Sequence, residues 1–213
     1  MKKIIKKPQS INSRTEYKRT FSLIEMYRAF MLIPSILVKI KSNNTKGLLS
    51  KDFIERLHLA VTEVNGCATC SYAHTHMALK QGMSSEEINS FLSGDGQFII
   101  KEEAKAIIFA QHFADKRGFP KEDAFNIIVQ EYGIEKASII LSASQMMLAG
   151  NIYGIPLSAL LSRLKKKPYK NSSLIYEIGM LISGFLILPI SLIHGLIRQI
   201  LGISNIILDK KLE

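Results

Sequence analysis

Apolar and polar positions alternate with the period of an α-helix through most of the chain. In the clearest run, apolar side chains return to one face every three or four positions, at Phe53, Leu57, Ala60, Val61 and Val64. Ser50 is placed to cap the start of this helix, and the Asn65-Gly66 pair ends it. A second helix is predicted from about residue 67 to residue 81, with Gly82 in the usual stop position.

The same pattern predicts further helices, and alternating strand-like runs are scarce. The predicted helices cover residues 17–41, 84–92, 101–117, 120–132, 134–149 and 156–166. Pro34 is expected to break or kink the first of them, Gly133 to close the fourth, and Pro156 to open the last. We therefore predict one all-α domain over residues 16–165, preceded by a basic tail at 1–15 and followed by a segment of different character at 166–213.

That last segment contains a long apolar stretch. From Ile178 to Ile197 there is no Asp, Glu, Lys or Arg. An apolar helix of roughly 20 residues is long enough to cross a bilayer, and Pro189 is tolerated there. Two interpretations stay open: contact with membrane lipid, and packing of the helix on the domain or at an oligomer interface.

The charge is concentrated at two places. The net charge is +10, and most of it lies in residues 1–20 and 163–170. Neither cluster has the interleaved aromatic residues of a nucleic-acid surface, so we predict no nucleic-acid partner. Anionic lipid is the better candidate, with solvated tails as the alternative. The start of the chain lacks an uninterrupted apolar run, so we expect a cytoplasmic protein, at the inner face of the membrane if the apolar stretch binds lipid.

The two cysteines point to thiol chemistry. Cys67 and Cys70 stand at the start of a predicted helix, three positions apart, and His74 follows one turn later on the same face. A helix N-terminus stabilises a thiolate, and a neighbouring imidazole can accept the thiol proton. A carboxylate would orient that imidazole. Glu63 and Glu55 are both candidates, and their spacing alone does not choose between them.

Glu55, Cys67, Cys70 and His74 form a specific pattern: Glu, eleven residues, Cys-x-x-Cys, three residues, His. In this respect the sequence resembles the AhpD-like alkylhydroperoxidases of the carboxymuconolactone decarboxylase family, with a weaker likeness on to about Gly154. The resemblance implies an all-α domain that forms homo-oligomers and acts as a thiol peroxidase. It also implies a peroxide substrate and a dithiol reductant of the thioredoxin-like or lipoyl type.

The resemblance assigns roles to four residues. Cys70 would be the peroxidatic thiolate, Cys67 the resolving cysteine that forms a disulfide with it, and Glu55 and His74 the proton relay. The helix dipole, in contrast, favours activation of Cys67, which is nearer the helix start. A histidine found between the cysteines in some relatives is absent here. His58, three residues after Glu55, is a candidate substitute or else an ordinary surface or satisfied histidine.

Three alternatives remain. Cys67, Cys70 and His74, with His58 or His76, could form a zinc site, although one helix face rarely closes a tetrahedron. The pair could be two buried thiols of a structural module, or it could serve a thiol-disulfide oxidoreductase or redox sensor without peroxidase activity. No phosphate loop, dinucleotide motif or haem attachment motif occurs, so no organic cofactor is predicted.

Overall fold

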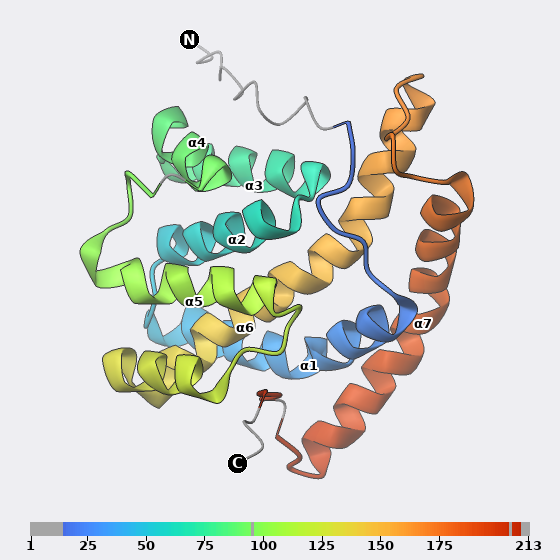
Figure 1. The fold of residues 1–213 in the computed structure, drawn as a ribbon. Helices are drawn as coiled ribbons and strands as arrows, with labels where there is room; N and C mark the ends of the chain where they lie inside the picture. The colour runs from blue at the N-terminus through green and yellow to red at the C-terminus, as the bar shows by residue number, and fades with distance from the viewer. Residues whose placement is uncertain (1–14, 95, 205, 210–213) are drawn as a thin grey trace.

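The computed structural model describes residues 15–94, 96–204 and 206–209, and within these ranges the chain forms seven α-helices, one short 3₁₀ helix and no strand (Figure 1). The elements are α1 (Leu23–Lys46), α2 (Lys51–Asn65), α3 (Ala68–Gln81), α4 (Ser85–Ser93), η2 (Lys101–Glu103), α5 (Ala104–Asp115), α6 (Glu122–Leu164) and α7 (Leu174–Ile200). The predicted all-α class is confirmed. The predicted tail at residues 1–15 lies almost wholly outside the described residues, and the predicted domain boundaries remain predictions.

The α2–α3 pair forms as its local sequence predicts. The Ser50 side chain accepts a hydrogen bond from the backbone N–H of Phe53 and caps α2. Gly66 ends α2 in the left-handed conformation, with φ of 78°, which a residue with a Cβ adopts only at a cost. The next residue, Cys67, is already the N-cap of α3. The reversal at Gly66 therefore sets the start of α3 directly after the end of α2.

The structure does not show the break expected at Pro34 or the helix start expected at Pro156. Helix α1 starts at Leu23, later than expected, because Ser22 and Glu25 form a capping box, and it then continues through Pro34 to Lys46 without a break. Helix α6 runs on through Pro156, where a new helix was expected to begin. Around this proline α6 is buried in the core, so packing of neighbouring side chains offsets the lost backbone hydrogen bond. The expected interruption at Gly133 is confirmed as a kink with φ of 76°.

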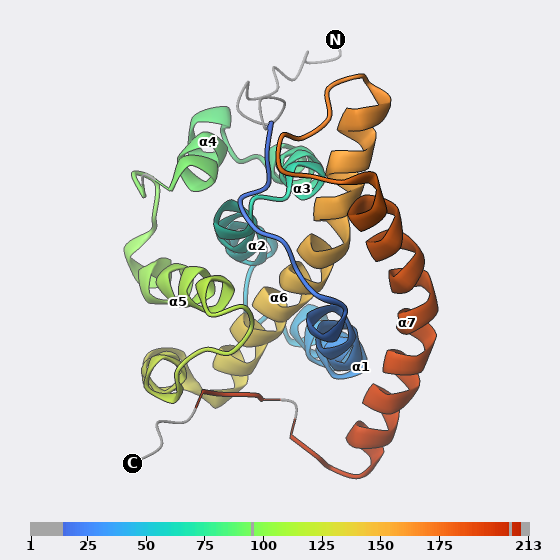
Figure 2. The ribbon, with the colours of Figure 1, turned by 45° about the vertical axis from the view of Figure 1, so that its right-hand side comes forward.

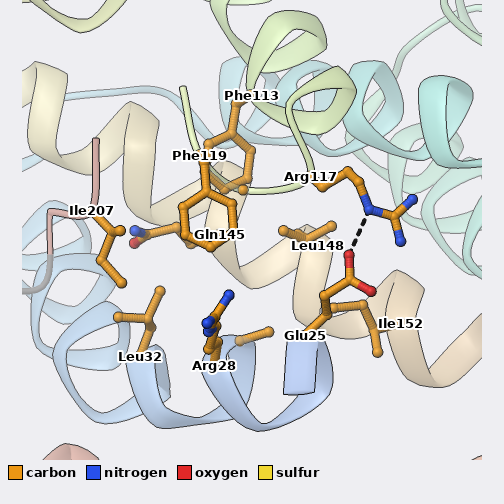
Figure 3. Close-up of a pocket in the computed structure, with 12 residues that line it drawn as sticks. Glu25, Arg28, Leu32, Phe113, Arg117, Phe119, Gln145, Leu148, Ile152 and Ile207 are labelled. Carbon is orange, nitrogen blue, oxygen red and sulfur yellow. Dashed lines mark hydrogen bonds and ion pairs between the residues drawn. The ribbon is translucent and has the colours of Figure 1, made fainter. Parts of the chain in front are cut away.

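The core lies between α2, α5 and α6, and α1 packs across α6 (Figures 1 and 2). A small cavity of about 30 Å³ remains between α1, α6 and the α5–α6 loop, beside the ion pair of Glu25 Oε1 and Arg117 Nε at 2.6 Å (Figure 3). A cavity of that volume holds one water molecule or so and no ligand. It is therefore too small to be a ligand site.

Helix α7 packs lengthwise on α1 and α6, along the outside of the bundle (Figure 2). One stripe of it is buried, formed by Glu177, Met180, Gly184, Ser191 and Gly195. Its first turn is held by Arg163, whose two nitrogens bind the Glu177 carboxylate at 2.8 Å each. Helix α7 is long and apolar enough to cross a membrane, and only 22% of its most apolar 18-residue stretch is buried. The helix therefore leaves most of its apolar surface uncovered by the described residues.

Candidate active site

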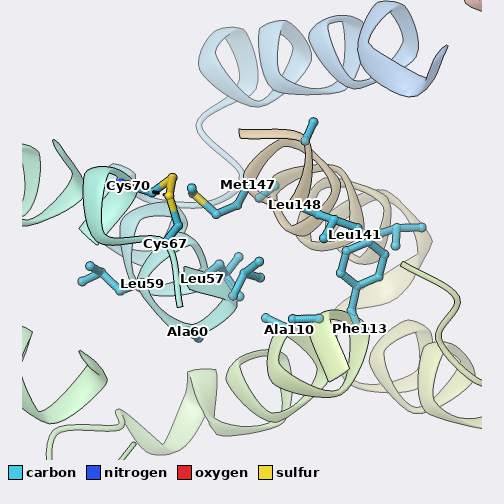
Figure 4. Packing of buried hydrophobic residues seen from close by; sticks show 14 of the residues in the cluster. Leu57, Leu59, Ala60, Cys67, Cys70, Ala110, Phe113, Leu141, Met147 and Leu148 are labelled. Atoms are coloured by element: carbon cyan, nitrogen blue, oxygen red, sulfur yellow. Dashed lines mark hydrogen bonds between the residues drawn. A yellow bond between two sulfur atoms is a disulfide. The ribbon is translucent and has the colours of Figure 1, made fainter. Parts of the chain in front are cut away.

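The two cysteines lie where α3 begins and are joined by a disulfide bond (Figure 4). Cys67 is the N-cap, Cys70 lies in the first turn, and their Cα atoms are 5.2 Å apart. The backbone N–H of Cys70 donates a hydrogen bond to Cys67 Sγ at 3.2 Å, so one amide of the first helical turn interacts with a sulfur atom. Cys67 is fully buried, whereas Cys70 is 7% exposed, which makes Cys70 the more accessible of the two.

Helix α6 covers the disulfide from the other side. A Cβ at Gly154 would lie 2.6 Å from Cys70 Sγ and 2.7 Å from Cys67 Sγ, so only a glycine allows this approach. One turn earlier, the carbonyl oxygen of Gly150 lies 3.7 Å from Cys70 Sγ. Met147 also extends towards the pair (Figure 4). The thiol site is therefore built by α3 and closed by α6.

Glu55 on α2 and His74 on α3 form the hydrogen bond that the sequence pattern predicts. Glu55 Oε1 lies 2.6 Å from His74 Nδ1. Burial alone would raise the pKa of Glu55, but its interactions with His58 and His74 outweigh burial and lower the pKa to about 2. The carboxylate is therefore ionised at neutral pH and can only accept, so Nδ1 of His74 carries the donated proton. In the neutral ring, Nε2 is left as the acceptor.

His58 is part of the same cluster. Its ring packs edge-on against that of His74, with centroids 4.9 Å apart, and its Nδ1 lies 3.7 Å from Glu55 Oε2. That distance is too long for a hydrogen bond. Among the described residues neither ring nitrogen has a hydrogen-bond partner. Burial lowers the pKa of His58 despite the nearby Glu55 carboxylate, so the ring is neutral at neutral pH.

His58 is therefore not at the surface, with a side chain only 14% exposed, whereas its part in the relay stays a prediction. The signal that places it was its spacing of three residues from Glu55 on one helix face. Thr69, which stands between the cysteines, bonds instead to α6, through its Oγ1 to Ser158 Oγ at 2.8 Å. The extra imidazole of this site thus comes from α2.

The other candidate residues lie elsewhere. Glu63, the alternative carboxylate, binds Lys18 Nζ at 2.5 Å and takes no part in the cluster. His76 is exposed on α3. Geometry thus selects Glu55 over Glu63 and His74 over His76. The four residues of the predicted pattern come from the two helices on either side of the Gly66 reversal.

The carboxylate and the two imidazoles also have the chemistry of a metal site. Glu55, His58 and His74 each offer one ligand atom, and these atoms lie within 4.8 Å of one another. Such a set suits zinc or iron. Binding a metal would break the hydrogen bond between Glu55 and His74. The zinc set expected from sequence is different, since it uses both cysteines, and these are bonded to each other in the structure.

A comparison with protein families agrees with the position of this site. The model of the carboxymuconolactone decarboxylase family matches residues 25–96, which include Glu55, Cys67, Cys70 and His74. Searches of curated proteins and of solved structures give no significant match. The weaker likeness expected up to Gly154 lies outside the matched residues, as does all of α7.

Proposed function

Because residues 25–96 carry the pattern of the carboxymuconolactone decarboxylase family, we propose that this protein is a thiol-dependent peroxidase acting through Cys70 and Cys67. The observation that carries the proposal is the hydrogen bond between Glu55 and His74, on the same two helices that bring the cysteines together. A purely structural pair of thiols would need neither an ionised buried carboxylate nor an imidazole oriented by it. Members of the family with decarboxylase activity lack the cysteine pair, which also favours the peroxidase branch.

Cys70 is the attacking thiol in this mechanism. It is the more accessible member of the pair at 7% exposure, whereas Cys67 is fully buried. His74, held by Glu55, accepts the thiol proton at Nε2. The Cys70 thiolate then attacks the terminal oxygen of the hydroperoxide, the O–O bond breaks, and Cys70 becomes a sulfenic acid. The departing alkoxide takes a proton back from His74 and leaves as the alcohol.

Cys67 completes the cycle. Its sulfur attacks the sulfenic sulfur of Cys70, forms the disulfide, and releases one water molecule. A dithiol donor then supplies two electrons and two protons, which restores both thiols and leaves the donor oxidised. The disulfide in the structure corresponds to the oxidised end of this cycle.

The test is peroxide consumption with several dithiol donors by the wild type and four variants. Cys70→Ser should abolish turnover, and His74→Gln and Glu55→Gln should each lower kcat by about 100-fold, the scale of general acid–base catalysis. His76→Gln changes an exposed histidine on the same helix and should keep full activity. Unchanged turnover in Cys70→Ser, with folding verified by circular dichroism, would refute the assignment.

A second function is favoured by one observation, the convergence of Glu55, His58 and His74. In that case the protein is a metal-dependent enzyme or a metal-binding module. Metal analysis of protein purified in reduced form decides between a metal site and the peroxidase. Near-stoichiometric zinc or iron that is lost in His58→Gln would replace the peroxidase proposal. A thiol-disulfide oxidoreductase would instead exchange disulfides with dithiol donors and leave peroxide untouched.

A further inference from the structure

An apolar cavity of about 520 Å³ lies between α1, α6 and α7 and reaches the relay histidines. Its volume falls within the range of roughly 300–1,000 Å³ that is usual for ligand sites. The cavity is lined by Phe30, Ile33, His58, His74, Met146, Met147, Ala149, Gly150, Tyr153, Gly184, Phe185 and Leu188. Apart from the two imidazoles and the Tyr153 hydroxyl, its side chains are apolar.

The cavity lies beside the thiol site, through lining residues that neighbour the cysteines. His74 lines it, and so does Gly150, whose carbonyl oxygen lies 3.7 Å from Cys70 Sγ. Met147 lines it as well and extends towards the disulfide (Figure 4). A molecule that occupies this space therefore has its polar end at the imidazoles of His58 and His74, beside the residues that neighbour Cys70, and the rest of its length against apolar side chains.

This distribution of polar groups selects the occupant. A sugar or a nucleotide would leave its own polar groups without partners in the apolar part, at a cost of about 1–3 kcal/mol each. The hydrocarbon part of a long acyl chain has no such groups, and its carboxyl or ester end can stay in solvent at the mouth of the cavity. The hydroperoxide would then be the single polar group inside the cavity, and it would meet the imidazoles. The cavity thus fits the hydroperoxide of a fatty acyl chain.

Helix α7 connects the cavity to an exposed apolar surface. Phe185 lines the cavity yet is 77% exposed, so the mouth opens on the outer face of α7. That face is formed by exposed apolar side chains, including Ile175, Ile182, Leu186, Ile190 and Ile193. Exposed apolar surface of this extent marks an interaction site. The exposed lysines at positions 165–167 and 170 precede α7 and complement anionic headgroups.

We propose that this protein reduces hydroperoxides of long acyl chains, which enter the cavity between α1 and α7 from an anionic lipid surface on which the outer face of α7 rests. The inner stripe of α7 is occupied by α1 and α6, so the helix lies along the lipid surface with the domain behind it and does not span the bilayer. The substrate class rests on the proposed peroxidase function. Binding of an acyl chain in the cavity does not depend on that function.

Substrate preference is the first test, with dithiothreitol as donor. The wild type should show a kcat/KM at least about tenfold higher for linoleic acid hydroperoxide than for tert-butyl hydroperoxide, because the acyl chain adds buried apolar surface. Leu188→Trp fills the mouth and should reduce that preference about tenfold. Ile108→Trp, an equal change at an exposed position of α5, should leave the preference intact. Equal preference in the two variants, or none in the wild type, would overturn the proposal.

Binding of cis-parinaric acid, a fluorescent fatty acid, gives a readout that needs no turnover. Cys70→Ser protein should bind it saturably, and the added Leu188→Trp change should abolish binding. If no peroxide is consumed but this pattern appears, the peroxidase function fails and the acyl cavity stands. If tert-butyl hydroperoxide is consumed and the probe does not bind, the cavity inference fails alone.

Flotation of the protein with lipid vesicles tests whether the acyl substrate comes from a lipid surface. The protein should float with vesicles containing phosphatidylglycerol and much less with pure phosphatidylcholine vesicles, and added salt should weaken the binding. Absence of flotation, while free linoleic acid hydroperoxide remains a preferred substrate, would overturn the lipid-surface source. A lipid-free dimer that excludes the probe would assign the outer face of α7 to a second copy and overturn the proposal.

Discussion

Replacing Gly154 with alanine tests how tightly α6 closes over the thiols. The added Cβ would lie 2.6 Å from Cys70 Sγ and 2.7 Å from Cys67 Sγ. Favourable contacts between carbon atoms lie at roughly 3.5–4.0 Å, and sulfur is larger than carbon, so both contacts are about 1 Å too short. The two sulfurs are bonded to each other at the start of α3, and neither can rotate away alone. Helices α3 and α6 must therefore move apart.

The size of the effect follows from two opposing terms. Overpacking a filled core costs about 1–3 kcal/mol, whereas alanine in a helix interior is favoured over glycine by up to about 1 kcal/mol. Gly150, one turn away on α6, is the matched control, because its added Cβ would meet only Met147 Cε at an ordinary 3.6 Å. Both variants gain the same helix propensity. The difference between them isolates the overpacking cost, about 1–3 kcal/mol.

The assay is urea unfolding followed by far-ultraviolet circular dichroism, in a mild detergent that keeps α7 in solution. Oxidised Gly154→Ala should unfold at lower urea than oxidised Gly150→Ala. After reduction the difference should shrink, because each sulfur can then rotate separately. Equal stability of the two oxidised variants would show that α6 does not press on the disulfide, and the close approach of Gly154 to the two sulfurs would be wrong.

Three other changes probe the surroundings of the site. Glu55, with a pKa of about 2 against an ordinary 4.5, stabilises the fold above pH 4.5, and this stability of about 2–3 kcal/mol should be lost as the pH falls towards 2. A stability difference between wild type and Glu55→Gln that is independent of pH would contradict it. Gly195→Ala would place a Cβ 2.1 Å from a backbone oxygen of α1, so it should loosen α7 to proteolysis, whereas Gly179→Ala, with open space around it, should not. The two carboxylate oxygens of Glu103 accept hydrogen bonds from the buried Arg56 guanidinium at 2.6 and 2.7 Å. Glu103→Ala removes this main partner and should lower the free energy of unfolding in urea by about 3 kcal/mol, and a loss under about 1 kcal/mol would refute this.

The local signals for helix ends predicted the site hairpin because they act within a few residues. Ser50, Gly66 and Gly82 cap or stop their helices as expected, since each satisfies backbone groups of its own helix. Those ends are enough to bring Glu55 opposite His74. Spacing alone left Glu63 open, because both residues lie on α2 and packing decides which one faces α3; the family resemblance pointed to Glu55, and the structure pairs it with His74.

The prolines show where local signals fail. Pro34 and Pro156 each remove a backbone donor, and an isolated helix would break there. In α1 and α6 both prolines are buried, and the packing of whole helices outweighs the lost hydrogen bond. The cavity could not be predicted from sequence either. Its walls come from α1, α6 and α7, the lining residues of α1 lie more than a hundred residues before those of the other two, and no spacing rule relates them.

The site has two parts of different origin. The thiols and the Glu55–His74 pair lie within the residues that match the family, and in the proposed mechanism they carry out the reaction. The cavity wall made by α6 and α7 lies outside that match, and in the proposed mechanism it selects the substrate. If this division holds, changes at Leu188 alter substrate preference without altering the acid–base chemistry, and changes at Glu55 do the reverse. A Leu188 variant whose rates with all peroxides change in proportion would show that α7 belongs to the reacting machinery itself.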